Sequence, residues 1–295
     1  MNDKPMWVRS LDYAGPGVPQ TAAFYRELWK LTDVDSNAGN FLRGSGTEPY
    51  ILGLHPGARR GLVQVSLGVS DEATLAALRD KVVRAGVQAS PIIALDTPGG
   101  GVGFTLTDPD HRVLRITAEV AEVTPLPDPD APIRISHIVF NTTAIEKVAA
   151  FYTDVVGFRI SDWSEDQMVF LRCHSDHHSI ALNRSDRASI NHVAFELPTL
   201  DAYMRGIGRL KNGGYPVNWG PGRHGPGDNP FAYYIGPSGF VIEYTTQLEQ
   251  IDETVHQPRV WQRTAEQSDR WMLAGPPSRQ MRTAMAGEPD AGFQG

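Results

Sequence analysis

Residues 108–115 read DPDHRVLR, and residues 236–243 read GPSGFVIE, a similar turn and apolar run at an offset of 128 residues. Two further pairs recur at almost the same offset: FLR at residues 41–43 and 170–172, and FY at residues 24–25 and 151–152. Three independent pairs at nearly one spacing indicate that the chain contains a duplicated module. All other motifs are therefore placed relative to these two copies.

The second copy alternates between strand-like and helix-like patterns. Apolar and polar residues alternate over residues 133–141, whereas apolar residues recur at helical spacing over residues 143–156. Strand-like runs follow at residues 159–161, 168–172 and 179–183. A second round predicts a strand at 190–197, a helix at 199–212, strands at 216–219, 231–235 and 240–246, and a glycine-rich loop at 219–229. Each round is a βαβββ unit, so the chain is expected to hold four such units in an α+β fold.

The seam between the copies is residues 123–132, which contain four prolines and favour extended backbone. We therefore expect an N-terminal module at residues 1–122, a linker at 123–132 and a C-terminal module at 133–250. The tail, residues 251–295, is polar and irregular but keeps Trp261 and Trp271. We expect this tail to dock on the C-terminal module, as a lid over its opening or as an interface element.

Composition excludes several classes of protein. The apolar fraction is 41% and the charged fraction 21%, which fits a folded globular chain rather than a disordered or fibrous one. Acidic residues exceed basic ones by 34 to 27, and no dense basic stripe favours nucleic acid. No apolar run approaches the ~18 residues of a membrane helix. A single cysteine, Cys173, agrees with a reducing compartment, so we expect a soluble cytoplasmic protein whose metal ligands are His and carboxylate.

Six of the nine histidines fall between residues 137 and 224. His137 and His192 lie in the first predicted strands of successive rounds, and Glu243 lies in the last strand of the second round. Strands of one curved sheet can direct these three side chains to one point. Two imidazoles and one carboxylate with open positions are the ligand set of non-haem Fe(II) oxygenases. A structural ion pair or buried core histidines are the alternative interpretation.

The first copy lacks this ligand set. By the repeat offsets, Gln64 takes the position of His192, Arg115 that of Glu243 and Pro49 that of His178, while residues 10–12 stand near the position of His137. A guanidinium stays protonated and cannot bind a cation. We therefore expect one metal per chain, held in the C-terminal module.

The chain resembles the two-module type I extradiol catechol dioxygenases of the vicinal oxygen chelate superfamily over about residues 6–250. The motifs that carry the resemblance are HIVF at 137–140, HSIAL at 178–182, NHVAFE at 191–196, GPGRHG at 220–225 and YYIGPSGFVIEY at 233–244. The resemblance implies two tandem modules, each an open curved β-barrel, and iron ligands at His137, His192 and Glu243. It places the acid/base histidine at His178 and two supporting residues at His224 and Tyr233.

The implied reaction is Fe(II)-dependent ring cleavage of a catechol by O2, in the breakdown of aromatic compounds, with Mn(II) as the alternative metal. An imidazole that titrates near neutral pH suits His178 for taking and returning a proton. Tyr233 would donate to a substrate oxygen and His224 to a catecholate oxygen, whereas Tyr234 should face the opposite side of its strand. His174 and His177 are interpreted as surface residues.

Two other functions stay open at this point. One is a different metal-dependent reaction of the superfamily, such as a glyoxalase-like isomerisation or ring cleavage with Mn(II). The other is a protein that binds an aromatic ligand without turnover. His178 and Tyr233 beside a full ligand set favour chemistry, because sequestration needs no proton carrier. The resemblance also implies a homo-oligomer.

Overall fold

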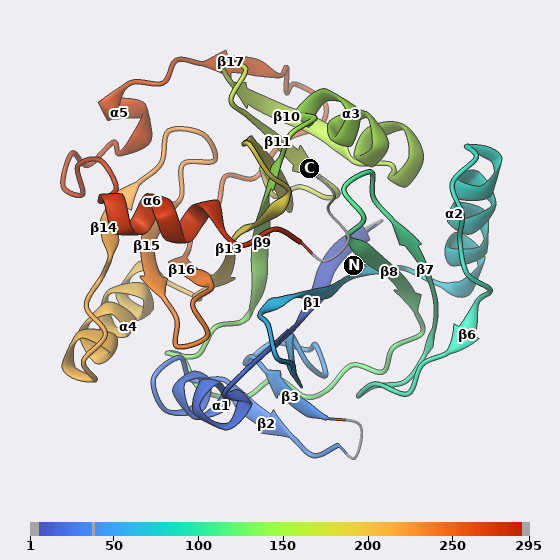
Figure 1. The fold of residues 1–295 in the computed structure, drawn as a ribbon, viewed down its shortest axis with the longest axis horizontal. Helices are drawn as coiled ribbons and strands as arrows, with labels where there is room; N and C mark the ends of the chain where they lie inside the picture. Colours follow the sequence, from blue (N-terminus) through green and yellow to red (C-terminus); the bar gives the residue numbers. More distant parts are fainter. Residues whose placement is uncertain (1–5, 37–38, 291–295) are drawn as a thin grey trace.

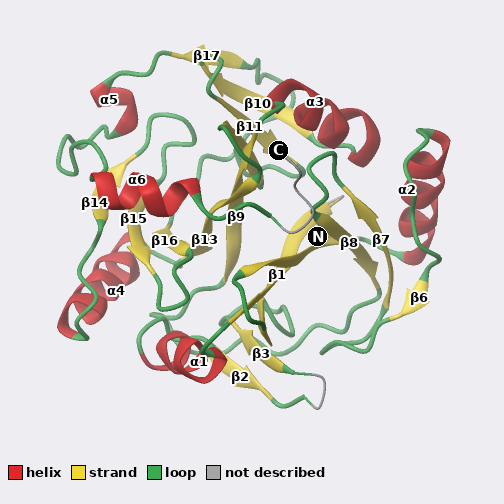
Figure 2. Ribbon diagram, in the orientation of Figure 1, coloured by secondary structure: helices red, strands yellow, loops and turns green. Residues whose placement is uncertain are grey.

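A computed structural model describes residues 6–36 and 39–290, and it is a mixed α+β fold (Figure 1; Figure 2). The N-terminal half contains β1 (Met6–Gly15), α1 (Val18–Glu27), β2 (Thr32–Val34), β3 (Asn40–Arg43), β4 (Leu52–Pro56), β5 (Gly61–Val69), α2 (Glu72–Arg84), β6 (Ile93–Ala94), β7 (Val102–Thr107) and β8 (Val113–Ala118). The C-terminal half contains β9 (Arg134–Thr142), α3 (Ile145–Ala150), β10 (Arg159–Ser164), β11 (Met168–Arg172), β12 (Ile180–Arg184), β13 (Ser189–Glu196), α4 (Leu200–Asn212), β14 (Trp219–Arg223), β15 (Pro230–Ile235) and β16 (Val241–Thr245). The expected βαβββ pattern is confirmed in both halves.

The strands form two open sheets. Within the described residues, one has the order β2-β3-β4-β1-β5-β8-β7-β6, and the other has the order β14-β15-β16-β13-β9-β12-β11-β10-β17, where β17 is Arg259–Trp261. The two orders correspond under the repeat, since β1 and β9 are central and pair antiparallel with β5 and β13. This shared topology places equivalent residues of the two copies at equivalent points of their sheets.

Three elements of the tail lie against the C-terminal half. They are β17 (Arg259–Trp261), α5 (Ala265–Ser268) and α6 (Arg279–Ala286), and they are the red segments of Figure 1. β17 adds a parallel strand to the edge of the sheet beside β10. α6 crosses in front of β15, β16 and β13 and contacts β13.

Two local predictions differ from the structure. The helix expected over residues 143–156 is α-helical only to Ala150 and continues as a π-helix over Phe151–Val156. The strand expected at 216–219 is instead β14, so the glycine-rich segment is not wholly a loop. β14 is an edge strand with an irregular register against β15, and an edge position tolerates Pro221, which has no N–H to donate.

A continuous apolar core joins the two halves. Trp29 follows α1 and is fully buried against β16, where its ring stacks on Tyr244 at 3.7 Å between centroids. The Tyr244 hydroxyl donates to the Trp29 carbonyl at 3.1 Å. This packing fixes β16, which carries Glu243, against the N-terminal half. None of the helices within residues 6–36 and 39–290 is both long and apolar enough to cross a membrane.

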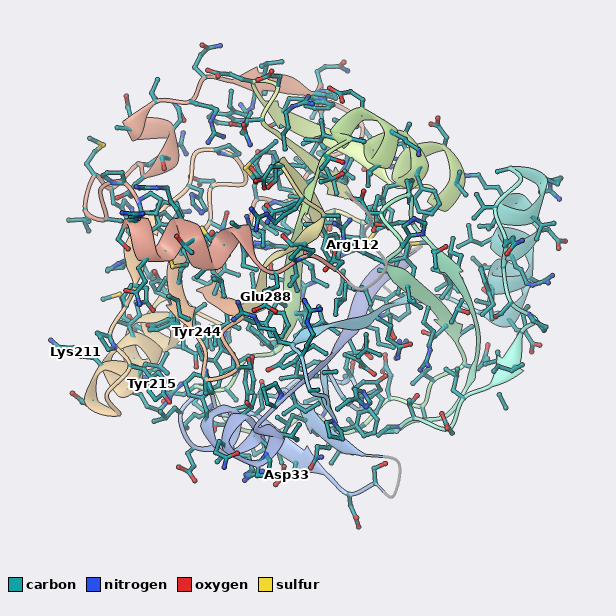
Figure 3. The ribbon with its side chains drawn as sticks, in the orientation of Figure 1. Asp33, Arg112, Lys211, Tyr215, Tyr244 and Glu288 are labelled. Carbon is teal, nitrogen blue, oxygen red and sulfur yellow. The ribbon has the colours of Figure 1, made fainter. Side chains whose placement is uncertain are left out.

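A buried ionic cluster forms a second junction. Arg112, in the turn before β8, has no exposed side-chain surface and lies at the centre of the molecule (Figure 3). Its guanidinium pairs with Asp108 at 3.1 Å, with Asp110 at 2.9 Å and with Asp290 of the tail at 2.7 Å. It also donates to the carbonyl of Asn141 in β9 at 2.5 Å. One cation therefore ties the N-terminal half, the C-terminal sheet and the tail together.

Replacement of Arg112 by Met should destabilise the protein strongly, because it leaves three carboxylates in the interior without their cation. Burial already raises the pKa of Asp108 and of Asp290. Loss of one partner of a buried ion pair costs about 3–5 kcal/mol, so the urea unfolding midpoint should fall clearly. The matched control is Arg184→Met, which removes an exposed pair with Glu146 and should leave the midpoint unchanged. Equal midpoints for the two variants would contradict a structural role for the cluster.

Candidate metal centre

Three neighbouring strands bring His137, His192 and Glu243 together. β13 lies between β9 and β16, and Ala194 of β13 pairs with His137 on one side and with Glu243 on the other. His192 is two residues before Ala194 and shares its face of the sheet, because side chains alternate along a strand. The expectation that strands of one sheet direct these side chains to one point is therefore met by the register.

The ligand atoms of these residues face each other inside the protein. A carboxylate oxygen of Glu243 lies 3.3 Å from Nε2 of His137 and 3.2 Å from Nε2 of His192, and all three side chains are buried. Among the described residues, neither oxygen of Glu243 nor Nε2 of His192 has a hydrogen-bond partner of good geometry. Buried polar atoms seldom lack partners, and two nitrogens with one carboxylate suit Fe(II) or Mn(II). The donor set fits a divalent metal.

The charge state of the cluster also fits a cation. Burial opposes ionisation of Glu243, but the adjacent imidazoles of His137 and His192 outweigh it and lower the pKa of the carboxyl to about 2. Burial lowers the pKa of His192, which keeps its imidazole neutral. Nδ1 of His192 donates a hydrogen bond to the side-chain oxygen of Asn191 at 2.7 Å. The proton of the neutral ring is therefore on Nδ1, and the Nε2 lone pair is directed toward Glu243. This arrangement directs the Nε2 lone pair of His192 and a carboxylate oxygen of Glu243 to one point.

His178 lies beside this cluster, in the segment between β11 and β12. Its ring centroid is 4.2 Å from that of His137, and burial lowers the pKa of His178 well below the usual value. Its Nδ1 lies 3.0 Å from Nδ1 of His177, whose Nε2 is 3.1 Å from Asp162. The prediction that His177 is a surface residue is wrong, because the hydrogen bond with Asp162 allows a polar ring to be fully buried.

His174 is likewise buried rather than exposed, contrary to the prediction. Its Nδ1 accepts from the backbone of Asp176 at 3.2 Å, and its Nε2 lies 3.3 Å from the hydroxyl of Ser179. These partners lie within five residues of His174 and close a local turn. His174 therefore supports the segment that carries His178 and does not line the cavity.

His224 and Tyr233 form a hydrogen-bonded pair on the other side of the cluster. Nδ1 of His224 donates to the carbonyl of Ser268 at 2.9 Å, because a carbonyl can only accept. Burial lowers the pKa of His224, so Nε2 of the neutral ring accepts from the Tyr233 hydroxyl at 3.0 Å. The Tyr233 hydroxyl therefore donates its hydrogen bond to His224. The sequence instead predicts that Tyr233 and His224 each donate to the substrate. Tyr234 packs in the core against Trp29, on the opposite face as predicted.

A cavity of about 720 Å³ opens in front of these residues. Its wall includes the imidazoles of His137, His178, His192 and His224 and the phenol of Tyr233. Most of the remaining wall is apolar, and much of it comes from the tail: Trp261, Ala265, Met272, Pro276, Pro277, Met285 and Ala286. The volume falls within the range of small-molecule sites and far exceeds a single aromatic ring.

Comparisons with known proteins place this site in a family. Residues 134–244 match the model of the glyoxalase/bleomycin resistance protein/dioxygenase superfamily. A solved structure described as the Mn(II)-bound glyoxalase from Novosphingobium aromaticivorans is 35% identical, covers 93% of both chains and superposes with a TM-score of 0.88. The chain belongs to the glyoxalase/bleomycin resistance protein/dioxygenase superfamily.

Two curated proteins are also similar to this chain. Metapyrocatechase 2 of Cupriavidus necator is 30% identical over 55% of this chain, but the match spans only 46% of that protein. Biphenyl-2,3-diol 1,2-dioxygenase of Paraburkholderia xenovorans is 27% identical over 84% of this chain and 91% of that protein. The second match therefore extends over both halves of the molecule.

The N-terminal half has the same strand register as the C-terminal half but different residues at the positions of the candidate ligands. Ser66 pairs with Ser10 and Arg115 as Ala194 pairs with His137 and Glu243, so Ser10 and Arg115 occupy the positions of two candidate ligands. Gln64, at the position of His192, donates to Asp12 at 3.0 Å. Within the described residues, His137, His192 and Glu243 are the only histidine, cysteine and carboxylate side chains that bring three ligand atoms within 4.8 Å of one another.

One equivalence in the N-terminal half must be corrected. Leu11 donates to the carbonyl of Ile51 as Ile138 donates to that of Ser179. This register puts Tyr50, rather than Pro49, at the position of His178. The single-residue error arises because the offset taken from the FLR pair, 129, is not constant along the chain.

Acidification should destabilise the metal-free protein. Burial keeps His178 and His224 neutral in the folded state, whereas in the unfolded chain a histidine binds a proton near pH 6.5. Below that pH the unfolded state holds more protons, so the free energy of unfolding falls as the pH falls. The melting temperature in the presence of a chelator should drop between about pH 7.5 and about pH 5.5. The variant His224→Gln should give a shallower drop, and a flat or rising profile for the native chain would contradict these pKa directions.

Proposed function

We propose that this protein is an extradiol dioxygenase, which opens the ring of a catechol with O2 at a divalent metal held by His137, His192 and Glu243. The observation that carries the proposal is the buried triad with unpaired ligand atoms, facing a cavity that also exposes His178 and the His224–Tyr233 pair. Support comes from the names of the similar proteins, metapyrocatechase 2 and biphenyl-2,3-diol 1,2-dioxygenase. The proposed role of the reaction is the breakdown of aromatic compounds.

The proposed metal is Fe(II), and Mn(II) is the second candidate. Both accept two imidazoles and one carboxylate, and the similar solved structure is described as Mn(II)-bound. The chemistry supplied by such a metal is chelation of both catechol oxygens and activation of O2 at the remaining positions. Three protein ligands leave room for both. The proposal includes one metal per chain, because Arg115 and Gln64 replace ligands in the N-terminal half.

His178 is proposed to manage the protons of the reaction. Its ring lies beside His137, so a catechol bound near the triad would have a hydroxyl within reach of it. A neutral imidazole can accept the catechol proton and later return it to an oxygen that gains negative charge. Apolar side chains in the cavity wall exclude water from the buried imidazoles. The electrostatic interactions of the imidazoles are stronger as a result.

Tyr233 and His224 are proposed to orient the substrate. Because the Tyr233 hydroxyl donates its hydrogen bond to His224, its oxygen can accept a hydrogen bond from a catechol hydroxyl. His224 is held in turn by the carbonyl of Ser268 in α5. The pair therefore places a hydrogen-bond acceptor on the wall opposite His178, which restricts how the ring can sit.

We also propose the module boundaries of the sequence analysis, with the catalytic module at residues 133–250 and the tail from 251 onward as its lid. The tail supplies a large part of the cavity wall, and Asp269 caps the turn that shapes it by accepting from the backbone of Leu273 at 2.8 Å and of Ala274 at 2.7 Å. A homo-oligomer in the cytoplasm stays a prediction, which sedimentation and cell fractionation would test.

A second candidate function is a metal-dependent isomerisation, favoured by the description of the 35% identical structure as a glyoxalase. Isomerisation of a hemithioacetal consumes no oxygen, whereas ring cleavage consumes one O2 per catechol. Addition of a panel of substituted catechols to the Fe(II)-loaded protein in an oxygen electrode separates the two. A protein that only binds its aromatic ligand would consume none and would convert no hemithioacetal.

Glu243→Ala should abolish both metal retention and oxygen uptake, because it removes the only charged ligand of the triad. Metal content by elemental analysis and oxygen uptake with a catechol should both fall to background. The matched control, Glu146→Ala, removes an exposed carboxylate on α3 and should leave both unchanged. Full activity of the Glu243 variant, or two tightly held metals in the native chain, would contradict the assignment.

His178→Asn should separate proton transfer from metal binding. Metal content and anaerobic catechol affinity should stay nearly unchanged, while turnover slows by the ~10²- to 10⁴-fold typical of a lost general acid or base. The slowing should be largest for catechols of low acidity, which need most help to release a proton. The control is His111→Asn, at an exposed turn position with φ of 66° that Asn tolerates. Metal loss in proportion to activity would place His178 among the ligands instead.

A further inference from the structure

A chain of three side chains leads away from the candidate site into the interior. Nδ1 of His178 lies 3.0 Å from Nδ1 of His177, and Nε2 of His177 lies 3.1 Å from Oδ2 of Asp162 in β10. Asp162 and His177 have no exposed surface. The ring of Phe170 packs on both imidazoles, at 5.4 Å from His177 and 5.2 Å from His178 between centroids.

The hydrogen bonds of Asp162 fix the direction of this chain. Its Oδ1 accepts from the backbone of Arg259 at 2.9 Å, and its Oδ2 accepts from Nε1 of Trp261 at 2.6 Å. Burial opposes charge on Asp162, but hydrogen bonds from His177, Trp261 and Arg259 outweigh it and lower the pKa of the carboxyl to about 2. An ionised carboxylate can only accept, so Nε2 of His177 must donate to it.

The tautomer of His178 follows from that of His177. In a neutral imidazole one nitrogen donates and the other accepts. When His177 carries one proton, that proton lies on Nε2, its Nδ1 accepts, and the partner Nδ1 of His178 must carry the proton. Nε2 of His178 is then the bare nitrogen. It makes no hydrogen bond with the described residues, and His178 lines the cavity.

We propose that Asp162 and His177 are positioning residues that hold His178 as its Nδ1–H tautomer, with the Nε2 lone pair available to a substrate hydroxyl. The inference rests on the proposed role of His178 as the acid/base group. Without the two residues, His178 could rotate or place its proton on Nε2, where it cannot accept another. Buried carboxylates elsewhere orient a catalytic imidazole by accepting a hydrogen bond from its second nitrogen. Here Asp162 would act on His178 in the same way, but through His177.

The tail takes part in this arrangement through β17. Trp261 shares Oδ2 of Asp162 with His177, and the backbone of Arg259 bonds Oδ1, so both oxygens of the carboxylate are held in place. The main chain of His177 is held separately, by donation to the carbonyl of Glu249 at 2.8 Å. Loss of the His177 ring therefore removes the link to His178 while the backbone bond that anchors this segment remains.

The test compares three variants of the full-length, Zn(II)-loaded protein, since Zn(II) is diamagnetic and takes the same ligands. Nitrogen-15 NMR of the histidine side chains at about pH 8, above the ordinary histidine pKa, reports which nitrogen of each ring carries the proton. His178 should carry it on Nδ1 in the native protein and should lose that preference in His177→Phe. His177→Asn keeps an acceptor near the position of Nδ1 and should restore the preference.

Kinetics of the Fe(II)-loaded variants complete the test. The kcat of His177→Phe should fall on the order of 10²-fold, the lower end of the loss for a missing general base, with KM and metal content nearly unchanged. His177→Asn should recover most of this loss. The matched control is His55→Phe, which removes a histidine that pairs with Asp12 at 3.2 Å in the N-terminal half, and it should leave the His178 tautomer as in the native protein.

Each outcome bears on a different claim. A native His178 with its proton on Nε2, a doubly protonated His177, or an unchanged His178 tautomer in His177→Phe would overturn the positioning role, whatever the turnover. If the tautomer changes as expected while kcat does not, the positioning role stands and the acid/base assignment of His178 under the proposed function fails.

Discussion

Burial of the Glu243 carboxylate is the constraint on which the C-terminal half depends. A lone ionised carboxyl in an apolar interior is very unfavourable, and Glu243 has no hydrogen-bond donor of good geometry among the described residues. Its compensation must come from positive charge at the point it faces, which is the point that His137 and His192 also face. The order β16-β13-β9 creates this convergence, because one residue of the middle strand pairs with both neighbours. A divalent cation at this point would balance the buried negative charge, and the largely apolar cavity, His178 and the His224–Tyr233 pair lie around it.

The N-terminal half has the same strand order without such a buried carboxylate between two histidines, so it is a structural partner for the half that holds the candidate site. Its contribution is positional: Trp29 packs against β16 behind the candidate ligand, and Arg112 reaches the main chain of β9 beyond His137. Both contacts act on strands that carry the site and not on the site itself. The N-terminal half can therefore carry Arg115 and Gln64 at the positions of Glu243 and His192 and still support the strands of the C-terminal half.

The fold and the triad were predictable because both follow from local pattern and repeat spacing. Alternation marks strands, and the repeat offset aligns Glu243 with Arg115, whose guanidinium cannot bind a cation. His177 could not be predicted, since its burial depends on Asp162, 15 residues earlier, and on a strand of the tail. The direction of the His224–Tyr233 bond depends on the carbonyl of Ser268, 44 residues away in sequence from His224. β14 was missed because glycine and proline mask an edge strand. The features that could not be predicted are hydrogen bonds between residues far apart in the sequence, because the local sequence pattern contains no information about them.

The bond between Arg112 and Asp290 spans 178 residues of chain, and this separation bears on biosynthesis. Both βαβββ pairs can leave the ribosome and form their sheets before residue 290 is made. Until then Arg112 has Asp108, Asp110 and the carbonyl of Asn141 as partners but not yet Asp290. Long-range closure is slow relative to local pairing, so a nascent chain passes through a stage in which both modules are formed and the end of the tail is not yet fixed. The order of synthesis therefore makes the tail the last segment to join the buried cluster.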